Sequence, residues 1–144
     1  MASSDTPSGR PQIVQISDSS GGVPKHGVPS AWVSSPRLLR DYSRVSLRLL
    51  AERVTIIDGL VKRGAFSEVW VPAFQAKDLA LALDVRSSML AAARRLAARG
   101  AVDRLVRAAW ALDAAGDIGN RSDVESAATA LTGAAHDLEQ VFAR

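Results

Sequence analysis

The chain has 144 residues, of which 47% are hydrophobic but only 5% aromatic, and it carries a net charge of +3 with no cysteine. This length suits a single domain. The lack of cysteine excludes disulfides, thiol chemistry and cysteine-based metal sites, and it is typical of proteins in a reducing compartment. No apolar run approaches the roughly 18 residues of a membrane-spanning helix, and the polar residues 1–10 predict no signal peptide. We therefore expect a soluble, cytoplasmic protein.

The charge is distributed unevenly along the chain. Residues 36–107 hold fourteen Lys and Arg against seven Asp and Glu, a net charge of +7. Residues 108–144 hold two basic side chains against six acidic ones, a net charge of −4. A basic middle and an acidic end predict either self-pairing or an anionic partner for the basic part.

Residues 1–35 are rich in serine, glycine and proline, a composition typical of a disordered tail. The alternative is a tail that becomes ordered against a partner, with Ile13, Ile16, Val28 and Trp32 as apolar anchors. Within residues 13–33, Ile13-Val14-Gln15-Ile16, Gly21-Gly22-Val23-Pro24-Lys25 and Val28-Pro29 resemble the opening strands of MOSC sulfurtransferase domains. The Gly-Asp motif and the catalytic cysteine of that family are missing, so the resemblance implies no activity.

A first long helix is predicted for about residues 36–63. It begins at Ser35-Pro36, a hydroxyl N-cap followed by proline at the first helical position, and it stops at Gly64. Apolar side chains recur along it at three- and four-residue steps, apart from one longer step, as on the buried face of a helix. The main stripe is Leu38, Tyr42, Val45, Leu49, Ile56 and Leu60, and Leu39, Leu50, Val54, Ile57 and Val61 widen it.

The middle of the chain predicts a loop and then more helix. Residues 66–74 are expected to form a loop or a short extended segment, pinned by Trp70 and Phe74. A helical region follows over about residues 73–115, with a turn at Arg86-Ser87-Ser88 and an end or kink at Gly100. Glycine and asparagine in residues 115–120 then predict a clear break.

The last helix is predicted for about residues 122–143, with Ser122 and Glu125 as a capping box. Its apolar residues follow the 3-4-3-4-3 spacing of a coiled-coil seam. We expect the chain to form a homodimer through this seam, and packing on the chain's own domain is the alternative. The residues assigned to self-association are Val124, Leu131, Leu138 and Val141.

The sequence offers little for catalysis. His26 and His136 are far apart and cysteine is absent, so no metal site is predicted. No glycine-rich phosphate loop follows a strand, and no serine or threonine lies in a nucleophile-elbow pattern. We therefore predict that the protein is not an enzyme and needs no cofactor, and no small-molecule substrate is evident.

Arginines form two rows on the predicted helices. One basic ridge has a 3-4-4 spacing on the first helix, on the side away from its leucines, and it comprises Arg37, Arg40, Arg44 and Arg48. The second row is Arg95, Arg99 and Arg107, with Arg86, Arg94 and Arg104 nearby. A solvated helix face explains such rows most simply, and phosphate contacts or an acidic protein partner are the alternatives.

Residues 74–104 resemble a bacterial winged helix-turn-helix segment. The similarity rests on the Leu-Ala repeats of residues 78–85, the turn at residues 86–88, and residues 90–102 with their Gly-hydrophobic ending. In that family the second helix lies in the major groove of DNA. Residues 102–115 depart from the family, because they predict helix where a two-stranded wing belongs. The resemblance implies DNA contacts by Arg86, Ser87, Ser88, Ala91, Arg94 and Arg95.

Together these patterns predict an all-α fold, a small bundle of three to five helices in residues 36–144 that follows a disordered tail. The leading hypothesis is a non-catalytic interaction or assembly subunit that acts by protein–protein contacts, with a second copy or another protein as its partner. The alternative is a helix-turn-helix transcriptional regulator that binds DNA. No membrane partner is expected.

The composition of the tail gives a first test. Deleting residues 1–34 should leave the helical circular dichroism and the melting temperature nearly unchanged, because a proline-rich segment of low hydrophobicity adds little to a core. Thermal melts of the full chain and the truncated chain measure this. A fall of more than a few degrees would show that Trp32 and its neighbours belong to the core.

Overall fold

The computed structural model describes residues 36–143, apart from the side chains of Pro36 and Leu39. This part of the chain forms four α-helices and two short 3₁₀ helices, without strands, which confirms the predicted all-α fold. Residues 1–35, with the predicted tail, its four anchors and the MOSC-like segment, lie outside the described residues. The elements are α3 (Pro36–Lys62), η2 (Phe66–Glu68), α4 (Trp70–Arg86), η3 (Ser87–Met89), α5 (Ala92–Ile118) and α6 (Arg121–Phe142).

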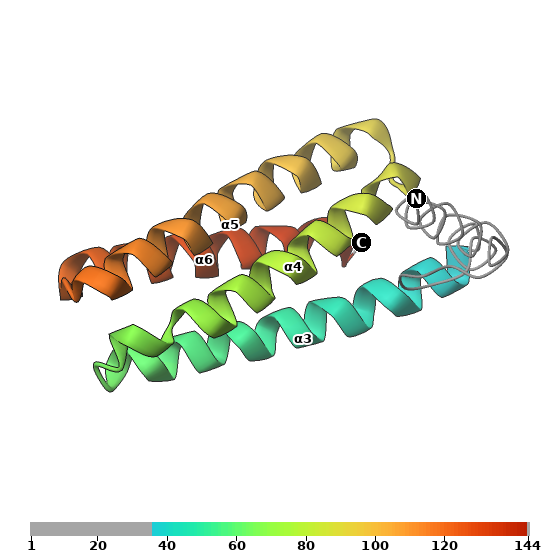
Figure 1. Ribbon diagram of the computed structural model, residues 1–144. Helices are drawn as coiled ribbons and strands as arrows, with labels where there is room; N and C mark the ends of the chain where they lie inside the picture. Colours follow the sequence, from blue (N-terminus) through green and yellow to red (C-terminus); the bar gives the residue numbers. More distant parts are fainter. Residues whose placement is uncertain (1–35, 144) are drawn as a thin grey trace, which may run out of the picture. The chain divides into compact units, whose positions relative to one another are not determined.

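Consecutive helices run in opposite directions and lie side by side, as in an up-and-down bundle (Figure 1). Each helix packs on its neighbour in the sequence, and α6 returns to contact α3. The contact between α5 and α6 is the most extensive of these pairs and the one between α3 and α6 is the least extensive. The seam between α3 and α6 is therefore the most open side of the bundle.

Small side chains occupy much of the interior of α4 and α5. Alanine is fully buried at several core positions, where it lets neighbouring helices approach closely. Leucines fill the space between these close contacts. The fully buried alanines are Ala73, Ala76, Ala80, Ala98, Ala101 and Ala109, and the fully buried leucines are Leu83, Leu105, Leu112, Leu131 and Leu138.

The predicted helix α3 is confirmed, but the main stripe assigned to its buried face is wrong. Leu38, Val45 and Ile56 are exposed, and of the main stripe only Leu60 reaches the buried core. Three of the positions that widened the stripe, Leu50, Ile57 and Val61, are buried, because α3 has apolar residues on two adjacent faces and only one of them meets the bundle. The buried residues of α3 are Ser43, Ser46, Leu50, Ile57, Leu60 and Val61.

The loop predicted for residues 66–74 is also wrong. Its first part is the 3₁₀ helix η2, and α4 already begins at Trp70. Pro72 lies in the first turn of α4, where a missing N–H costs no intrahelical hydrogen bond. Val69 before it is fully buried and anchors the turn to the core.

The turn after α4 is confirmed as η3, whereas the end or kink predicted at Gly100 is absent because α5 continues through this residue. The predicted break before the last helix is confirmed at Gly119, whose φ of +82° ends α5 in the left-handed conformation.

The capping box predicted at Ser122 is wrong. The side chain of Asn120 is the N-cap of α6, and it accepts a hydrogen bond from the N–H of Asp123 at 3.0 Å.

Two helical glycines test this packing in opposite directions. A Cβ placed on Gly116 would lie 2.5 Å from the carbonyl oxygen of Phe66, whereas a Cβ on Gly133 would meet nothing within 4 Å. Gly133→Ala should therefore raise the free energy of unfolding by about 0.5–1 kcal/mol, because alanine loses less backbone entropy in a helix. Gly116→Ala should lower it by about 1–3 kcal/mol through overpacking. Urea denaturation measures both, and changes of the same sign would contradict the close approach of η2 to α5.

Candidate functional site

The residues predicted to mediate self-association lie inside the bundle. Val124, Leu131 and Leu138 are fully buried against the chain's own helices, and Val141 is partly buried beside them. The seam of α6 thus forms core in a single chain, as the alternative interpretation expected. A second copy is not needed to cover these four side chains, so an interface between copies has to use another surface.

Five of the six residues that the helix-turn-helix resemblance assigned to DNA have side chains that form hydrogen bonds within the chain, and Ala91 is the exception. Arg86 and Ser87 are buried. One guanidinium nitrogen of Arg86 donates a hydrogen bond to the carbonyl oxygen of Ala82 at 2.8 Å, and the guanidinium carbon lies 3.6 Å from the centre of the Tyr42 ring. This contact fastens the end of α4 to α3.

The next two arginines hold the beginning of α5. The Nε atom of Arg94 donates to the carbonyl oxygen of Val141 at 3.2 Å, and Arg95 donates to that of Leu90 at 3.1 Å. Ser88 and Ala91 are the two assigned residues that are exposed. Residues 102–115, where the family has its wing, belong to the uninterrupted helix α5. DNA binding by this segment stays a prediction.

A surface that the sequence reasoning did not single out lies on α4 and α5. The ring centres of Trp70 and Phe74 are 6.2 Å apart, and those of Phe74 and Trp110 are 4.8 Å apart. The Nζ atom of Lys77 lies 5.0 Å from the centre of the Phe74 ring and 5.5 Å from that of Trp110. We call these four side chains, with the exposed Leu81 and Val85 of α4 and Leu96 of α5, the aromatic face.

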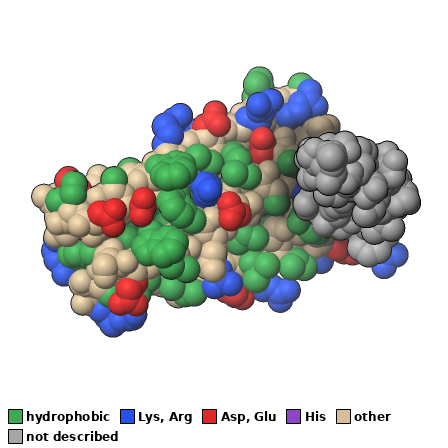
Figure 2. Space-filling model, in the orientation of Figure 1, with side chains coloured by type: hydrophobic (Ala, Val, Ile, Leu, Met, Phe, Trp, Pro, Cys, Tyr) green, Lys and Arg blue, Asp and Glu red, His purple; other side chains and the backbone are tan. Residues whose placement is uncertain are grey.

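Much of the aromatic face is open to solvent. Trp70 is 47% exposed and Trp110 is 54% exposed, although both are large apolar side chains. Figure 2 shows hydrophobic side chains gathered on the side of the bundle where α4 and α5 face the viewer. Trp70 and Phe74 were predicted to pin a loop, which the helix α4 replaces. The sequence did contain a signal for the exposure of the tryptophans. A tryptophan side chain is too large for helices that pack closely through buried alanines.

The basic ridge predicted on α3 lies at the surface. Arg37, Arg40, Arg44 and Arg48 are all exposed, and Arg44 forms a loose ion pair with Asp41 at 3.8 Å. Three of these arginines line one end of a groove between α3 and α6. The largest cavity of the groove measures 630 Å³, and its lining comprises Arg40, Ser43, Arg44, Leu47, Arg48, Ala51, Glu139, Phe142 and Ala143.

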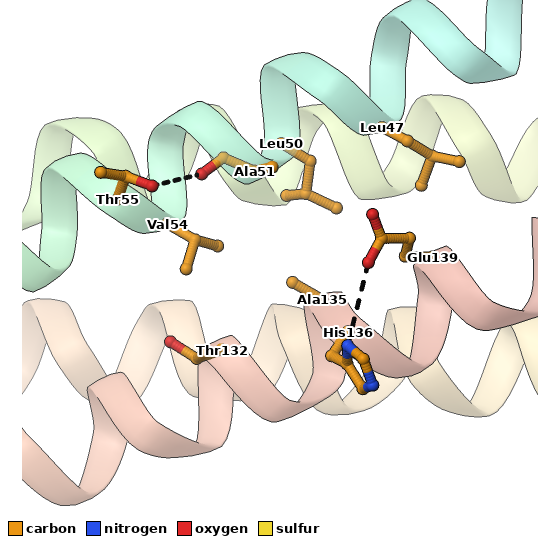
Figure 3. A pocket seen from close by; sticks show the side chains of 9 residues that line it. All are labelled: Leu47, Leu50, Ala51, Val54, Thr55, Thr132, Ala135, His136 and Glu139. Carbon is orange, nitrogen blue, oxygen red and sulfur yellow. Dashed lines mark hydrogen bonds and ion pairs between the residues drawn. The ribbon is translucent and has the colours of Figure 1, made fainter.

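A second cavity of 260 Å³ continues the groove along the same two helices. Figure 3 shows Leu47, Leu50 and Val54 extending from α3, whereas α6 contributes the small Thr132 and Ala135 and also His136 and Glu139, whose Nδ1 and Oε1 atoms lie 3.8 Å apart. The short side chains of Thr132 and Ala135 leave part of the space between the two helices unfilled. The two cavities share three lining residues, which are Leu47, Ala51 and Glu139.

The titratable groups of the described residues add little chemistry. The pKa of Lys62 is raised, first because Asp58 accepts a hydrogen bond from its ammonium group and second because the two charges attract. The Nζ–Oδ2 distance is 2.9 Å and both side chains are exposed, so this is a surface ion pair at the end of α3. Within residues 36–143, no cluster of histidine and carboxylate side chains is placed to hold a metal ion, and none of the helices there has both the length and the apolar composition of a membrane span.

Comparisons with known proteins give no further assignment. No protein-family profile matches the chain, and neither the curated proteins nor the solved structures provide a match. Two surfaces of the bundle therefore stand as candidate sites on their geometry alone. They are the aromatic face and the groove between α3 and α6.

The buried arginine at the end of α4 provides a test of the DNA assignment. Arg86→Ala should lower the free energy of unfolding by about 2–3 kcal/mol, because a charged hydrogen bond and a cation–π contact are lost together. The exposed Arg63 serves as a control, and Arg63→Ala should change the free energy of unfolding by less than about 0.5 kcal/mol. If Arg86→Ala leaves the stability unchanged, the guanidinium group of Arg86 contributes nothing to the fold, and it could then serve to bind a ligand.

Proposed function

We propose that this protein is a non-catalytic interaction or assembly subunit and that two copies of the chain meet through the aromatic face. The observation that carries the proposal is the exposure of Trp70 and Trp110, two rigid apolar side chains that the chain's own core leaves half uncovered. Tryptophan is enriched among the residues that dominate binding energy at protein interfaces, because it covers a large area at little entropic cost.

The apolar surface extends beyond the rings. Val85 is 71% exposed and Leu96 is 74% exposed, so neither side chain contributes much to the fold of a single chain. Leu96 and Trp110 are separated by two heptads on α5, and Trp70, Phe74, Leu81 and Val85 share one side of α4 by helical spacing. An exposed apolar surface of this kind is typical of a binding site between proteins.

The charges among these residues favour a second copy as the partner. Lys77 and Asp78 lie on α4. Asp103 and Arg107 are exposed residues of α5, and in the sequence they lie between Leu96 and Trp110. A surface that carries both signs of charge can be complementary to itself when a two-fold axis brings two copies together. The homodimer expected from the sequence is thus retained in the proposal, with the aromatic face in place of the seam of α6.

Light scattering across a concentration series tests the proposal. The wild-type chain should be a dimer at high micromolar concentration, and the double variant Val85→Glu with Leu96→Glu should weaken dimerisation by about tenfold or more, because it places charges in the interface. Ile118→Glu is the matched control, since Ile118 is 79% exposed at the end of α5 and lies outside the aromatic face.

The helical circular dichroism of both variants should match that of the wild type, because all three residues project into solvent. A wild type that stays monomeric throughout the series, or a dimer that the double variant leaves intact, would refute the proposed interface.

A further inference from the structure

We propose that the groove between α3 and α6 binds a single-chain anionic amphiphile, such as a long-chain carboxylate, with its head group at the arginines of the basic ridge. This proposal is independent of the aromatic face, because none of the residues that line the groove belongs to that face. The shape of the groove, its apolar length and the polar groups at one end support it in turn.

The groove is elongated. Its lining runs along α3 from Arg40 at one end to Thr55 at the other, which corresponds to about 22 Å at the helical rise of about 1.5 Å per residue. Its cavities of 630 and 260 Å³ fall near the range of about 300–1,000 Å³ that is usual for small-molecule sites. A long, narrow ligand fits this space better than a compact one.

Much of the lining in the middle of the groove is apolar. Leu47, Leu50 and Val54 of α3 lie opposite the small Thr132 and Ala135 of α6, and the longer His136 and Glu139 of α6 line the same cavity (Figure 3). An alkyl chain laid along the partly exposed Leu47 and Val54 would remove their apolar surface and its own from water, and this is a favourable change. The small side chains of α6 therefore leave room for a ligand that supplies the missing apolar volume.

The end of the groove near the beginning of α3 carries positive charge. Arg40, Arg44 and Arg48 recur at four-residue steps and line the larger cavity. Their guanidinium groups can donate charge-assisted hydrogen bonds to a carboxylate or a related anion. Glu139 lies where the two cavities meet, and its carboxylate repels a second anion there, so the head group belongs at the end of the groove beyond it.

A buried hydroxyl at this end also lacks a partner. Ser43 lines the larger cavity and is only 5% exposed, and its Oγ atom has no hydrogen-bond partner among the described residues. A buried polar group without a partner is costly, and such groups are rare in folded proteins. An anionic head group between the arginines can accept a hydrogen bond from this hydroxyl.

Other anionic ligands match only part of these features. Nucleic acid would satisfy the exposed arginines but would leave the apolar middle of the groove uncovered. Inorganic phosphate would likewise use the charged end alone. A single apolar chain with an anionic head group uses both parts, so it is the occupant that we propose.

The experiment is an isothermal titration of the full chain with dodecanoate below its micelle-forming concentration. We expect saturable binding of one ligand per chain, with the helical circular dichroism retained. Dodecyltrimethylammonium has the same tail with a cationic head, and acetate has the head group without the tail. Both should bind at least tenfold more weakly than dodecanoate.

Two pairs of charge reversals locate the site. Arg40→Glu with Arg48→Glu should weaken dodecanoate binding at least tenfold. Arg99→Glu with Arg107→Glu should leave it unchanged, although these two exposed arginines have the same eight-residue separation on α5 and the net charge changes equally. Ala51→Trp, which places a large ring at the junction of the two cavities, should also abolish binding. If this variant loses its helicity, the charge reversals alone decide the location.

Several results would overturn the proposal. They are the absence of saturable dodecanoate binding, equal binding of the cationic amphiphile, and equal losses in the two charge-reversal pairs. Binding of phospholipid vesicles or of an oligonucleotide in place of monomeric dodecanoate would also overturn it, since the arginines would then serve a different class of partner. The Val85→Glu and Leu96→Glu variant should bind dodecanoate normally, which separates this test from that of the dimer.

Discussion

The size of the core side chains governs the rest of this structure. Alanine at buried positions of α4 and α5, such as Ala76 and Ala101, allows the helix axes to come close together. Close helices leave little interior volume, and bulky side chains such as Trp110 then lie at the edge of the helix contact and not within it. Where α3 presents larger residues to the small Thr132 and Ala135 of α6, the difference in size leaves a groove between the two helices. Both candidate sites therefore have one cause, which is the mismatch in side-chain size between facing helices.

Local signals in the sequence were sufficient for the fold class and for most helix boundaries. The proline at the start of α3 and the glycine at position 119 act through backbone conformation, which depends little on the rest of the chain. The failures arose where tertiary packing outweighs local preference. Gly100 costs about 1 kcal/mol in a helix, yet the burial of Ala98, Ala101 and Val102 around it keeps α5 continuous. Asn120 and Ser122 are both good caps, and the end of the preceding helix decides between them.

The candidate sites were harder to predict because exposure is a property of helix pairs. The apolar residues of α3 cover two faces, and nothing within that helix says which face meets α4 and α6. Arg86 shows the same difficulty. In the sequence its position next to a turn suits a DNA contact, but in the structure its guanidinium group packs against the ring of Tyr42 on another helix. The basic ridge was predictable as a surface feature from its spacing alone. Its position beside an apolar groove became evident only when α6 was placed against α3.

The order of contacts around the bundle has a consequence for how the domain acquires its structure. Three of the four helix pairs join neighbours in the sequence across short turns, and contacts of this kind are associated with rapid folding. The pair α3–α6 joins the two ends of the domain, so closing this contact costs more loop-closure entropy than closing any one of the hairpins, by an amount that rises slowly with loop length. It is also the sparsest of the four contacts, and segments with few buried contacts open at a lower free energy than the rest of a domain. We therefore expect the separation of α3 from α6 to be the first step of unfolding. The hairpin of α5 and α6, which has the most extensive contact, should retain its structure longest.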